Sequence, residues 1–226
     1  MIRNMIQKKL SKTGKSYQID AQIPNAFLRK FLVVRLVMML RGLIKTRRKI
    51  YLGSNCKIWH LKNIHFGNNV TIENHSFIDG FASEPILLGD NVKIGAYSKI
   101  LCTSHLSKYG KGIKIGNNSA VGRFAEFGAA GGIVIGNDVI MGSYVSFHSE
   151  NHIFDQPNLP IREQGVTSKG ILLGNDIWVG AKVTFLDGAI IGNHCVVAAG
   201  AVVNGQFPDN CVIGGVPAKI IKYLNT

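Results

Sequence analysis

The chain has few acidic residues, few aromatic residues and few prolines, and it lacks closely spaced cysteines. Only 13 Asp and Glu stand against 26 Lys and Arg, aromatic residues make up 8% of the chain, and there are six prolines. The four cysteines (Cys56, Cys102, Cys195 and Cys211) have no CxxC spacing. This spacing argues against a zinc site and favours reduced, buried thiols in a cytoplasmic protein.

Acidic residues are scarcest at the N-terminus. Residues 1–50 contain 13 Lys or Arg and one acid, Asp20, which gives a net charge of +12, whereas the rest of the chain is close to neutral. Apolar residues between 27 and 44 are interrupted by Arg and Lys, so no uncharged run reaches the roughly 18–20 residues that span a bilayer. The basic character therefore belongs to a separate N-terminal segment.

We interpret residues 1–50 as a basic, amphipathic and helical segment. Residues 23–49 are expected to lie on an anionic membrane surface, through apolar burial and attraction to headgroups. The alternative is a basic helix packed on the end of the following domain or on a neighbouring subunit. Nucleic acid is not expected as a partner because aromatic and glycine motifs of RNA binding are missing, and the charges inside the apolar region disfavour a signal peptide.

From about residue 52 to 213 the chain repeats a six-residue pattern. Residues 135–140 read IGNDVI, residues 173–178 read LGNDIW, and residues 191–196 read IGNHCV. A period of six fits neither an α-helix nor a plain strand. Short hexad repeats are typical of a parallel β-helix, in which three hexads form one triangular coil and the aliphatic position points inward.

The spacing between equivalent aliphatic positions predicts the coils. The step from Leu173 to Ile191 equals three hexads, which is one coil, and the step from Ile115 to Ile135 is slightly longer. The much longer segment from Ile135 to Leu173 is interpreted as two coils, the second largely occupied by a loop over 153–169. The short step from Leu52 to Phe66 is interpreted as a frayed terminal repeat. We expect a β-helix domain over 51–214 and a short cap, helix or strand, over 215–226.

His152 stands where the repeat breaks into the predicted loop. Catalytic groups concentrate on loops held by a rigid scaffold. A histidine near neutrality can accept a proton from a hydroxyl group and return it. His152 is therefore the candidate base, and His148 is its natural rival.

The hexads, the Asn151-His152 pair before a loop and residues 174–180 (GNDIWVG) together resemble the hexapeptide-repeat acyltransferases. The likeness is strongest to sugar and polysaccharide O-acetyltransferases of the galactoside and maltose type, and residues 214–219 (GGVPAK) strengthen it. The resemblance implies an all-β fold, a left-handed parallel β-helix, and a homotrimer with active sites between subunits. It also implies acetyl-coenzyme A as co-substrate, no metal, and His152 as the general base.

The resemblance further implies a set of coenzyme contacts. Trp178 matches a tryptophan beside the pantetheine or the acceptor, small residues match backbone contacts to the pantetheine arm, and basic residues match phosphate contacts. The implied contact residues are Trp178, Ala181, Ala199, Asn204, Gly205, Lys219 and Lys222. One position departs from the pattern: where the galactoside-type enzymes have an Asn, this chain has Gly122 followed by Arg123. Either a backbone amide takes the place of that side chain, or the acceptor is held differently, or Arg123 or Asn151 contacts the oxyanion or the substrate.

These features together predict an O-acetyltransferase that acts on a sugar hydroxyl during surface-polysaccharide or lipopolysaccharide assembly. It would be cytoplasmic, or peripheral on the inner face of the membrane. The alternatives are an amino-sugar N-acetyltransferase, a drug-inactivating enzyme of the streptogramin or chloramphenicol type, and a non-catalytic trimeric scaffold.

Overall fold

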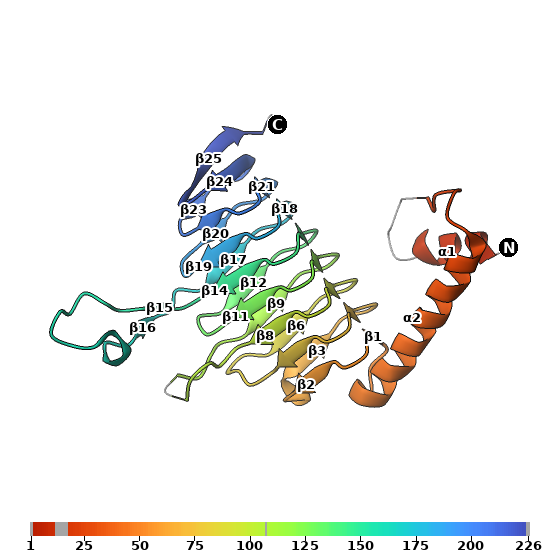
Figure 1. Cartoon of the computed structure of the whole chain (residues 1–226), viewed down its shortest axis with the longest axis horizontal. Helices are drawn as coiled ribbons and strands as arrows, with labels where there is room; N and C mark the ends of the chain where they lie inside the picture. Colours follow the sequence, from red (N-terminus) through yellow and green to blue (C-terminus); the bar gives the residue numbers. More distant parts are fainter. Residues whose placement is uncertain (1, 12–17, 107, 225–226) are drawn as a thin grey trace.

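The computed structural model describes residues 2–11, 18–106 and 108–224. Most of them form a three-sided column of stacked coils, a left-handed parallel β-helix, with two helices at its N-terminal end and a hairpin projecting from one side (Figure 1). We name the three sides faces A, B and C in the order in which the chain visits them.

Each face is a sheet whose neighbouring strands come from successive coils. Face A contains β1 (Tyr51–Leu52), β4 (Thr71–Ile72), β7 (Lys93–Ile94), β10 (Ala120–Val121), β13 (Ile140–Met141), β18 (Ile177–Val179), β21 (Cys195–Val197) and β24 (Cys211–Gly215). Face B contains β2 (Lys57–Trp59), β5 (Phe77–Asp79), β8 (Lys99–Leu101), β11 (Glu126–Gly128), β14 (Ser146–His148), β19 (Thr184–Leu186) and β22 (Val202–Val203). Face C contains β3 (Ile64–Phe66), β6 (Ile86–Leu88), β9 (Ile113–Ile115), β12 (Ile133–Ile135), β17 (Ile171–Leu173), β20 (Ile190–Ile191) and β23 (Gln206–Phe207).

The interior is a continuous apolar core, as the hexads predict. Ile135, Leu173 and Ile191 are stacked in adjacent strands of face C and are almost completely buried. Inside face B, the ring of Phe147 stacks on its neighbours Phe127 and Phe185 with centroids 4.8 and 4.7 Å away. All four cysteines are free and buried, which confirms the prediction of reduced core thiols.

Corner CA, between faces C and A, is closed by a column of Asn and Asp side chains. The backbone N–H of Asn117 donates to Oδ1 of Asn137 (2.7 Å), and the same contact repeats from Asn137 to Asn175 (2.8 Å) and from Asn175 to Asn193 (2.9 Å). These bonds satisfy turn amides that no strand pairs. The polar positions of the hexad therefore hold successive corners together.

Corner AB, between faces A and B, carries a column of aromatic rings that we did not predict. His75, Tyr97, Phe124 and Tyr144 all have positive φ angles near 60°, and their rings stack in order at 4.8, 5.0 and 4.8 Å. Bulky residues are rare in this conformation. Stacking one coil above the next offsets that conformational cost.

Two interpretations of the spacing were wrong. Ile135 pairs directly with Leu173, so the segment between them forms one coil with a long insertion rather than two coils. Leu52 belongs to face A and pairs with Ile72, so its distance to Phe66 on face C compares two different faces. A long insertion lengthens the step between two aliphatic positions as an additional coil would, and a comparison across two faces shortens it as a frayed coil would. Residue spacing alone therefore does not show which of these is present.

Two helices, α1 (Ile2–Ser11) and α2 (Asn25–Thr46), precede the column. Leu28, Gly42 and Thr46 of α2 are buried, and a β-carbon on Gly42 would lie 2.1 Å from the carbonyl oxygen of Ile50. The guanidinium of Arg41 donates to the carbonyl oxygen of Leu52 (2.9 Å). This contact caps β1, whose outer edge no further strand covers in the described part of the chain.

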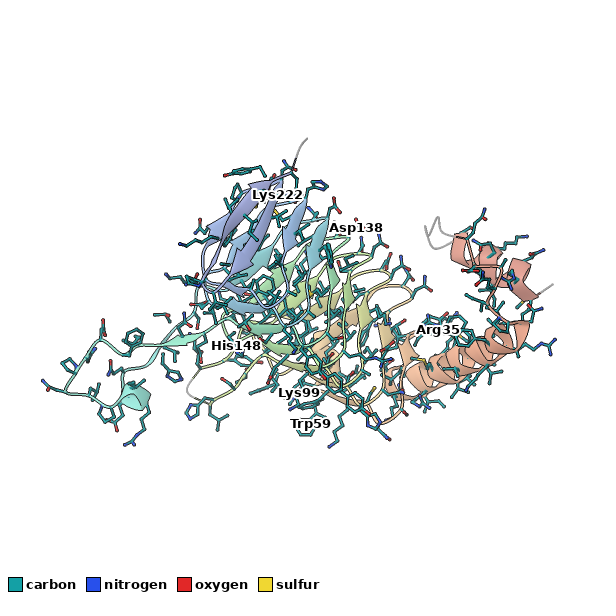
Figure 2. The ribbon with its side chains drawn as sticks, turned by 45° about the horizontal axis from the view of Figure 1, so that its top comes forward. Arg35, Trp59, Lys99, Asp138, His148 and Lys222 are labelled. Carbon is teal, nitrogen blue, oxygen red and sulfur yellow. The ribbon has the colours of Figure 1, made fainter. Side chains whose placement is uncertain are left out.

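Arg35 makes the second tie between α2 and face A. Its guanidinium lies 3.3 Å from the ring centroid of Tyr51 and donates to Oγ1 of Thr71 at 2.9 Å, and Figure 2 shows it between the helix and the column.

Among the residues that the structure describes, no helix is long and apolar enough to cross a bilayer.

The C-terminal cap is a strand rather than a helix. The strand β25 (Ala218–Tyr223) pairs antiparallel with β24 and extends face A. The described residues also form short 3-10 turns over Leu61–Asn63 and over Ile161–Glu163.

Candidate active site

His152 lies on a hairpin inserted into the fifth coil. The strand β15 (Asn151–His152) pairs antiparallel with β16 (Val166–Thr167), so that His152 lies opposite Val166. The hairpin extends away from the column at corner BC, between faces B and C (Figure 1). The His152 side chain is exposed, and among the described residues it has no hydrogen-bond partner in its own chain.

A buried glutamine orders the tip of this hairpin. The side-chain nitrogen of Gln164 donates to the carbonyl oxygens of Gln156 (2.9 Å) and Leu159 (2.6 Å), and its oxygen accepts from the N–H of Gln156 at 3.0 Å. Ile153 N–H also donates to Gly165 O at 3.1 Å. The segment predicted as a loop is therefore an ordered hairpin that holds His152 in place.

The base of the hairpin is tied to the column. Oδ1 of Asp187 accepts from the N–H groups of Lys169 (2.7 Å) and Gly170 (2.8 Å), where the chain re-enters the coil. On the other side, Lys108 contacts Ser168 and lies 3.9 Å from Glu150. Sequence reasoning missed Gln164 and Asp187 because neither has a neighbouring motif that marks its contacts.

His148, the rival base, ends β14 on face B. It pairs in register with Gly128 and Leu186 and points outward from the regular sheet, at the side from which the hairpin leaves (Figure 2). His148 belongs to the repeating scaffold, whereas His152 lies on the first residues of the inserted hairpin.

The predicted pantetheine positions lie elsewhere on the column. Trp178 is on the outer side of face A and is 58% exposed, and the exposed Ala181 and Ala199 follow at corner AB. Coils stack tightly here: a β-carbon on Gly142 would lie 2.6 Å from the nitrogen of Ala181, and one on Gly180 would lie 2.5 Å from that of Ala199. At these two coils a ligand would meet small side chains and backbone, whereas the preceding coils of the same corner present the rings of Phe124 and Tyr144.

The remaining predicted contacts gather toward the C-terminal end. Asn204 and Gly205 connect β22 to β23 at corner BC. Lys219 and Lys222 are exposed on β25 at the end of face A, where Figure 2 shows Lys222. Both lysines are therefore free to meet an anion.

One chain does not bring the whole predicted site together. His152 and Asn151 lie at corner BC, whereas Trp178, Ala181 and Ala199 lie on face A or at corner AB. Face B separates these two corners within a single column. A site that contains both sets needs a second copy of the chain.

Arg123 lies at corner AB next to an acidic residue that sequence reasoning missed. Nε of Arg123 is 3.9 Å from Oε2 of Glu73, and Nζ of Lys93 is 2.8 Å from Oε1 of the same carboxylate. Burial opposes ionisation of Glu73, but the hydrogen bond and charge of Lys93, the N–H of Ala96 and the charge of Arg123 together hold its pKa below the ordinary value. Arg123 is thus not beside His152 of its own chain.

The residues that the structure describes contain no group of three or more His, Cys, Asp or Glu side chains placed to hold a metal ion.

Comparisons with known proteins agree with the fold and with the hexads. A family model described as "Bacterial transferase hexapeptide (six repeats)" matches residues 170–205. The chain is 31% identical over 177 residues to the putative lipopolysaccharide biosynthesis O-acetyl transferase WbbJ of Escherichia coli, and the match covers 75% of this chain and 76% of that protein. It is also 31% identical over 135 residues to a probable acetyltransferase of Mycobacterium tuberculosis, covering 60% of this chain and 43% of that one.

A solved structure shows the same architecture. The chain is similar to a hexapeptide-repeat acetyltransferase of Vibrio cholerae complexed with acetyl coenzyme A, with a TM-score of 0.53 and 27% identity over 62% of this chain and 71% of that chain. Since a relative at 31% identity matches three quarters of both sequences, the chain is a member of the hexapeptide-repeat transferases, and it is an acyltransferase.

Proposed function

We propose that the protein is an acetyl-coenzyme A-dependent O-acetyltransferase that acts on a sugar hydroxyl in surface-polysaccharide or lipopolysaccharide assembly. The observation that carries this proposal is the placement of His152 on an ordered hairpin inserted into a rigid coil. The relative WbbJ, by its name, supports the acceptor class. The solved relative with bound acetyl coenzyme A supports the donor.

In the proposed reaction, His152 acts as general base. The imidazole takes the proton of the acceptor hydroxyl as the oxygen attacks the thioester carbonyl, and the carbon–sulfur bond then breaks. The proton passes from the imidazolium to the leaving sulfur, so coenzyme A leaves as the thiol and the acetyl ester remains on the sugar. A positioned base of this kind contributes about 10² to 10⁴ in rate.

Exposed apolar side chains support assembly as a homotrimer. On the outer side of face A, Ile140 and Trp178 are neighbours in register and more than half exposed. On the outer side of face C, Val134, Leu172 and Ile190 form a second exposed column. Exposed patches of this kind commonly mark interfaces between subunits.

The outer side of face B is polar in its middle coils, where Lys99, Glu126, Ser146 and Thr184 follow in register. Trp59 and Phe77 are the apolar residues on the outer side of its first two coils. Three columns related by a threefold axis bury both apolar faces if face A of each packs on face C of the next. Corner CA then points to the axis and face B points to solvent.

This packing also completes the site. Corner AB of one copy, with Ala181 and Ala199, would come next to corner BC of the following copy, with its His152. Arg123 at corner AB would then face the hairpin of that neighbour, where it can meet the acceptor or the oxyanion. With Gly122 in place of the Asn, the oxyanion would be contacted by Arg123, by Asn151 or by a backbone N–H.

The test is an acceptor assay with hydroxyl and amino sugars, in which acetylated products are weighed by mass spectrometry and then treated with mild base. Mild base removes an acetyl ester but not an acetyl amide. A base-stable product would therefore show that the enzyme is an N-acetyltransferase and not an O-acetyltransferase. Absence of acetyl-coenzyme A binding in calorimetry would leave a non-catalytic scaffold instead.

We also place this reaction on the inner face of the cytoplasmic membrane. The support is the net charge of +12 over residues 1–50, together with the exposed apolar residues of α2.

A further inference from the structure

One side of α2 is apolar and is left uncovered by the described part of the chain. Leu36, Leu40, Leu43 and Ile44 are 52, 48, 46 and 80% exposed. They follow at i, i+4, i+7 and i+8, a spacing that places side chains on the same side of a helix. We call these four residues the outer stripe.

The outer stripe differs from the two sides of α2 that face the column. At 3.6 residues per turn, the buried Leu28, Gly42 and Thr46 lie on another side. A groove of about 730 Å³ between α2 and face A is lined by a third group that includes Phe31, Val34 and Met38. Val33 and Val37, on the turns beside the outer stripe, form the edge of this lining, and none of the four outer-stripe residues belongs to it. The contacts that fix α2 on the column therefore leave the outer stripe free.

Cations border the outer stripe at both ends. Arg29 and Lys30 lie on the preceding turns and are exposed, and the exposed Arg47, Arg48 and Lys49 follow directly. Residues 25–49 contain no Asp or Glu. A partner of this surface must therefore bury apolar side chains and supply negative charge on both sides of them.

We propose that the outer stripe is the surface by which the protein lies on an anionic phospholipid bilayer, with α2 parallel to the membrane plane. The four apolar side chains would insert below the headgroups, and the flanking cations would contact lipid phosphates, as in interfacial helices. This inference rests on the proposed membrane placement, not on the acyl transfer. It identifies the side of α2 that meets lipid.

A helix in this orientation keeps its ties to the enzyme. Arg35 holds Tyr51 and Thr71, and Arg41 holds the carbonyl of Leu52, so the cations of α2 that face the column are already used. The hairpin with His152 projects from the opposite side of the column (Figure 1). Membrane contact through the outer stripe therefore leaves the proposed active site open.

The test compares two variants of the full chain that remove the same kind of side chain from different sides of α2. The double substitution Leu40→Gln and Ile44→Gln alters the outer stripe, and Phe31→Gln with Val34→Gln alters the groove. Flotation is measured with phosphatidylcholine vesicles with and without phosphatidylglycerol. Light scattering and circular dichroism check assembly and folding of each variant.

We expect the full chain to float only with vesicles that contain phosphatidylglycerol. The outer-stripe variant should partition roughly a hundredfold more weakly, since each large apolar side chain contributes about tenfold. The groove variant should change by less than about threefold. Removing one flanking cation, as in Arg47→Gln, should weaken binding about fivefold.

Three results would overturn the inference. Equal losses in the two variants would show that the side is wrong, and a full chain that floats equally without phosphatidylglycerol would show that lipid charge plays no part. A smaller assembly for the outer-stripe variant, with no vesicle binding by the full chain, would show that another copy covers the stripe. Acetyl transfer to a soluble sugar should persist in both variants. If the unsubstituted protein itself transfers no acetyl group, that result contradicts the proposed function and not the membrane surface.

Discussion

A β-carbon on Gly122 would lie 2.2 Å from the carbonyl oxygen of Gly142 in the next coil. The side chain that galactoside-type enzymes have at this place therefore has no room here, because the backbones of successive coils touch. The departure from the family pattern is built into the stacking of corner AB. The oxyanion donor must therefore be a side chain of another residue or a backbone N–H.

Gly122→Ala should lower the free energy of unfolding by about 1–3 kcal/mol, because the added methyl group overpacks the contact between two coils. The melting temperature should fall clearly as a result. Gly205→Ala is the matched control, since a β-carbon there would meet only Phe207 at 3.8 Å. Thermal unfolding followed by circular dichroism measures both. Equal melting temperatures for the two variants would contradict the close contact. Gly122→Asn should not raise kcat, because the larger side chain has no room beside Gly142.

His152→Ala should lower kcat by about 10² to 10⁴, because the base that takes the hydroxyl proton is lost. His148→Ala should change it by less than about tenfold, since His148 belongs to the sheet of face B. Steady-state kinetics with light scattering on both variants checks this. If the His148 variant is the inactive one, the assignment of the base is reversed.

Gln164→Ala should loosen the hairpin and leave the column intact. Three hydrogen bonds from its side chain are lost, and the carbonyls of Gln156 and Leu159 lose their donor. Limited proteolysis should cut this variant within residues 153–165 much faster than the parent chain, while Arg162→Ala, at an exposed position, should resemble the parent. An unchanged cleavage rate would argue against this role.

Glu73 should make stability depend on pH in the acid range. Its pKa is lowered in the folded state by Lys93, Ala96 and Arg123, so ionised Glu73 stabilises the fold above the unfolded value of about 4.3. That contribution is lost as the pH falls through the folded pKa. Glu73→Gln should therefore flatten the acid limb of a stability profile, and Glu126→Gln, exposed on face B, serves as the control. A parallel profile for both would contradict the ion contacts.

The thiols should be unreactive in the folded protein. Burial raises the pKa of Cys102 to about 12, so almost none of it is thiolate at neutral pH. Cys211, whose pKa burial and the nearby Cys195 thiol also raise to about 12, has its sulfur 3.7 Å from that of Cys195. A maleimide reagent followed by mass spectrometry should label all four cysteines only after unfolding.

The repeating part of the fold could be predicted closely from the sequence. Each of these hexads places its first and fifth residues inside, as at Ile191 and Cys195, and polar residues at a corner, as at Asn193, because a narrow coil has room inside only for apolar or small side chains. The same reasoning failed where the repeat is interrupted: spacing did not reveal that Ile135 pairs directly with Leu173.

The candidate site was predictable only in part. His152 could be found because it stands at the break in the repeat. The stacked rings of Tyr97 and Phe124 escaped notice because insertions make their spacing irregular, and one sequence does not show which side of α2 packs. His152 and Ala181 lie at different corners of one column, so the fold of a single chain does not group them into one site.

The insertion at residues 153–169 is held by a coil that closes without it, since Ile135 and Leu173 are adjacent rungs. Its length and composition are thus uncoupled from the column, so residues can be added or removed here without shifting the register of any coil above or below it.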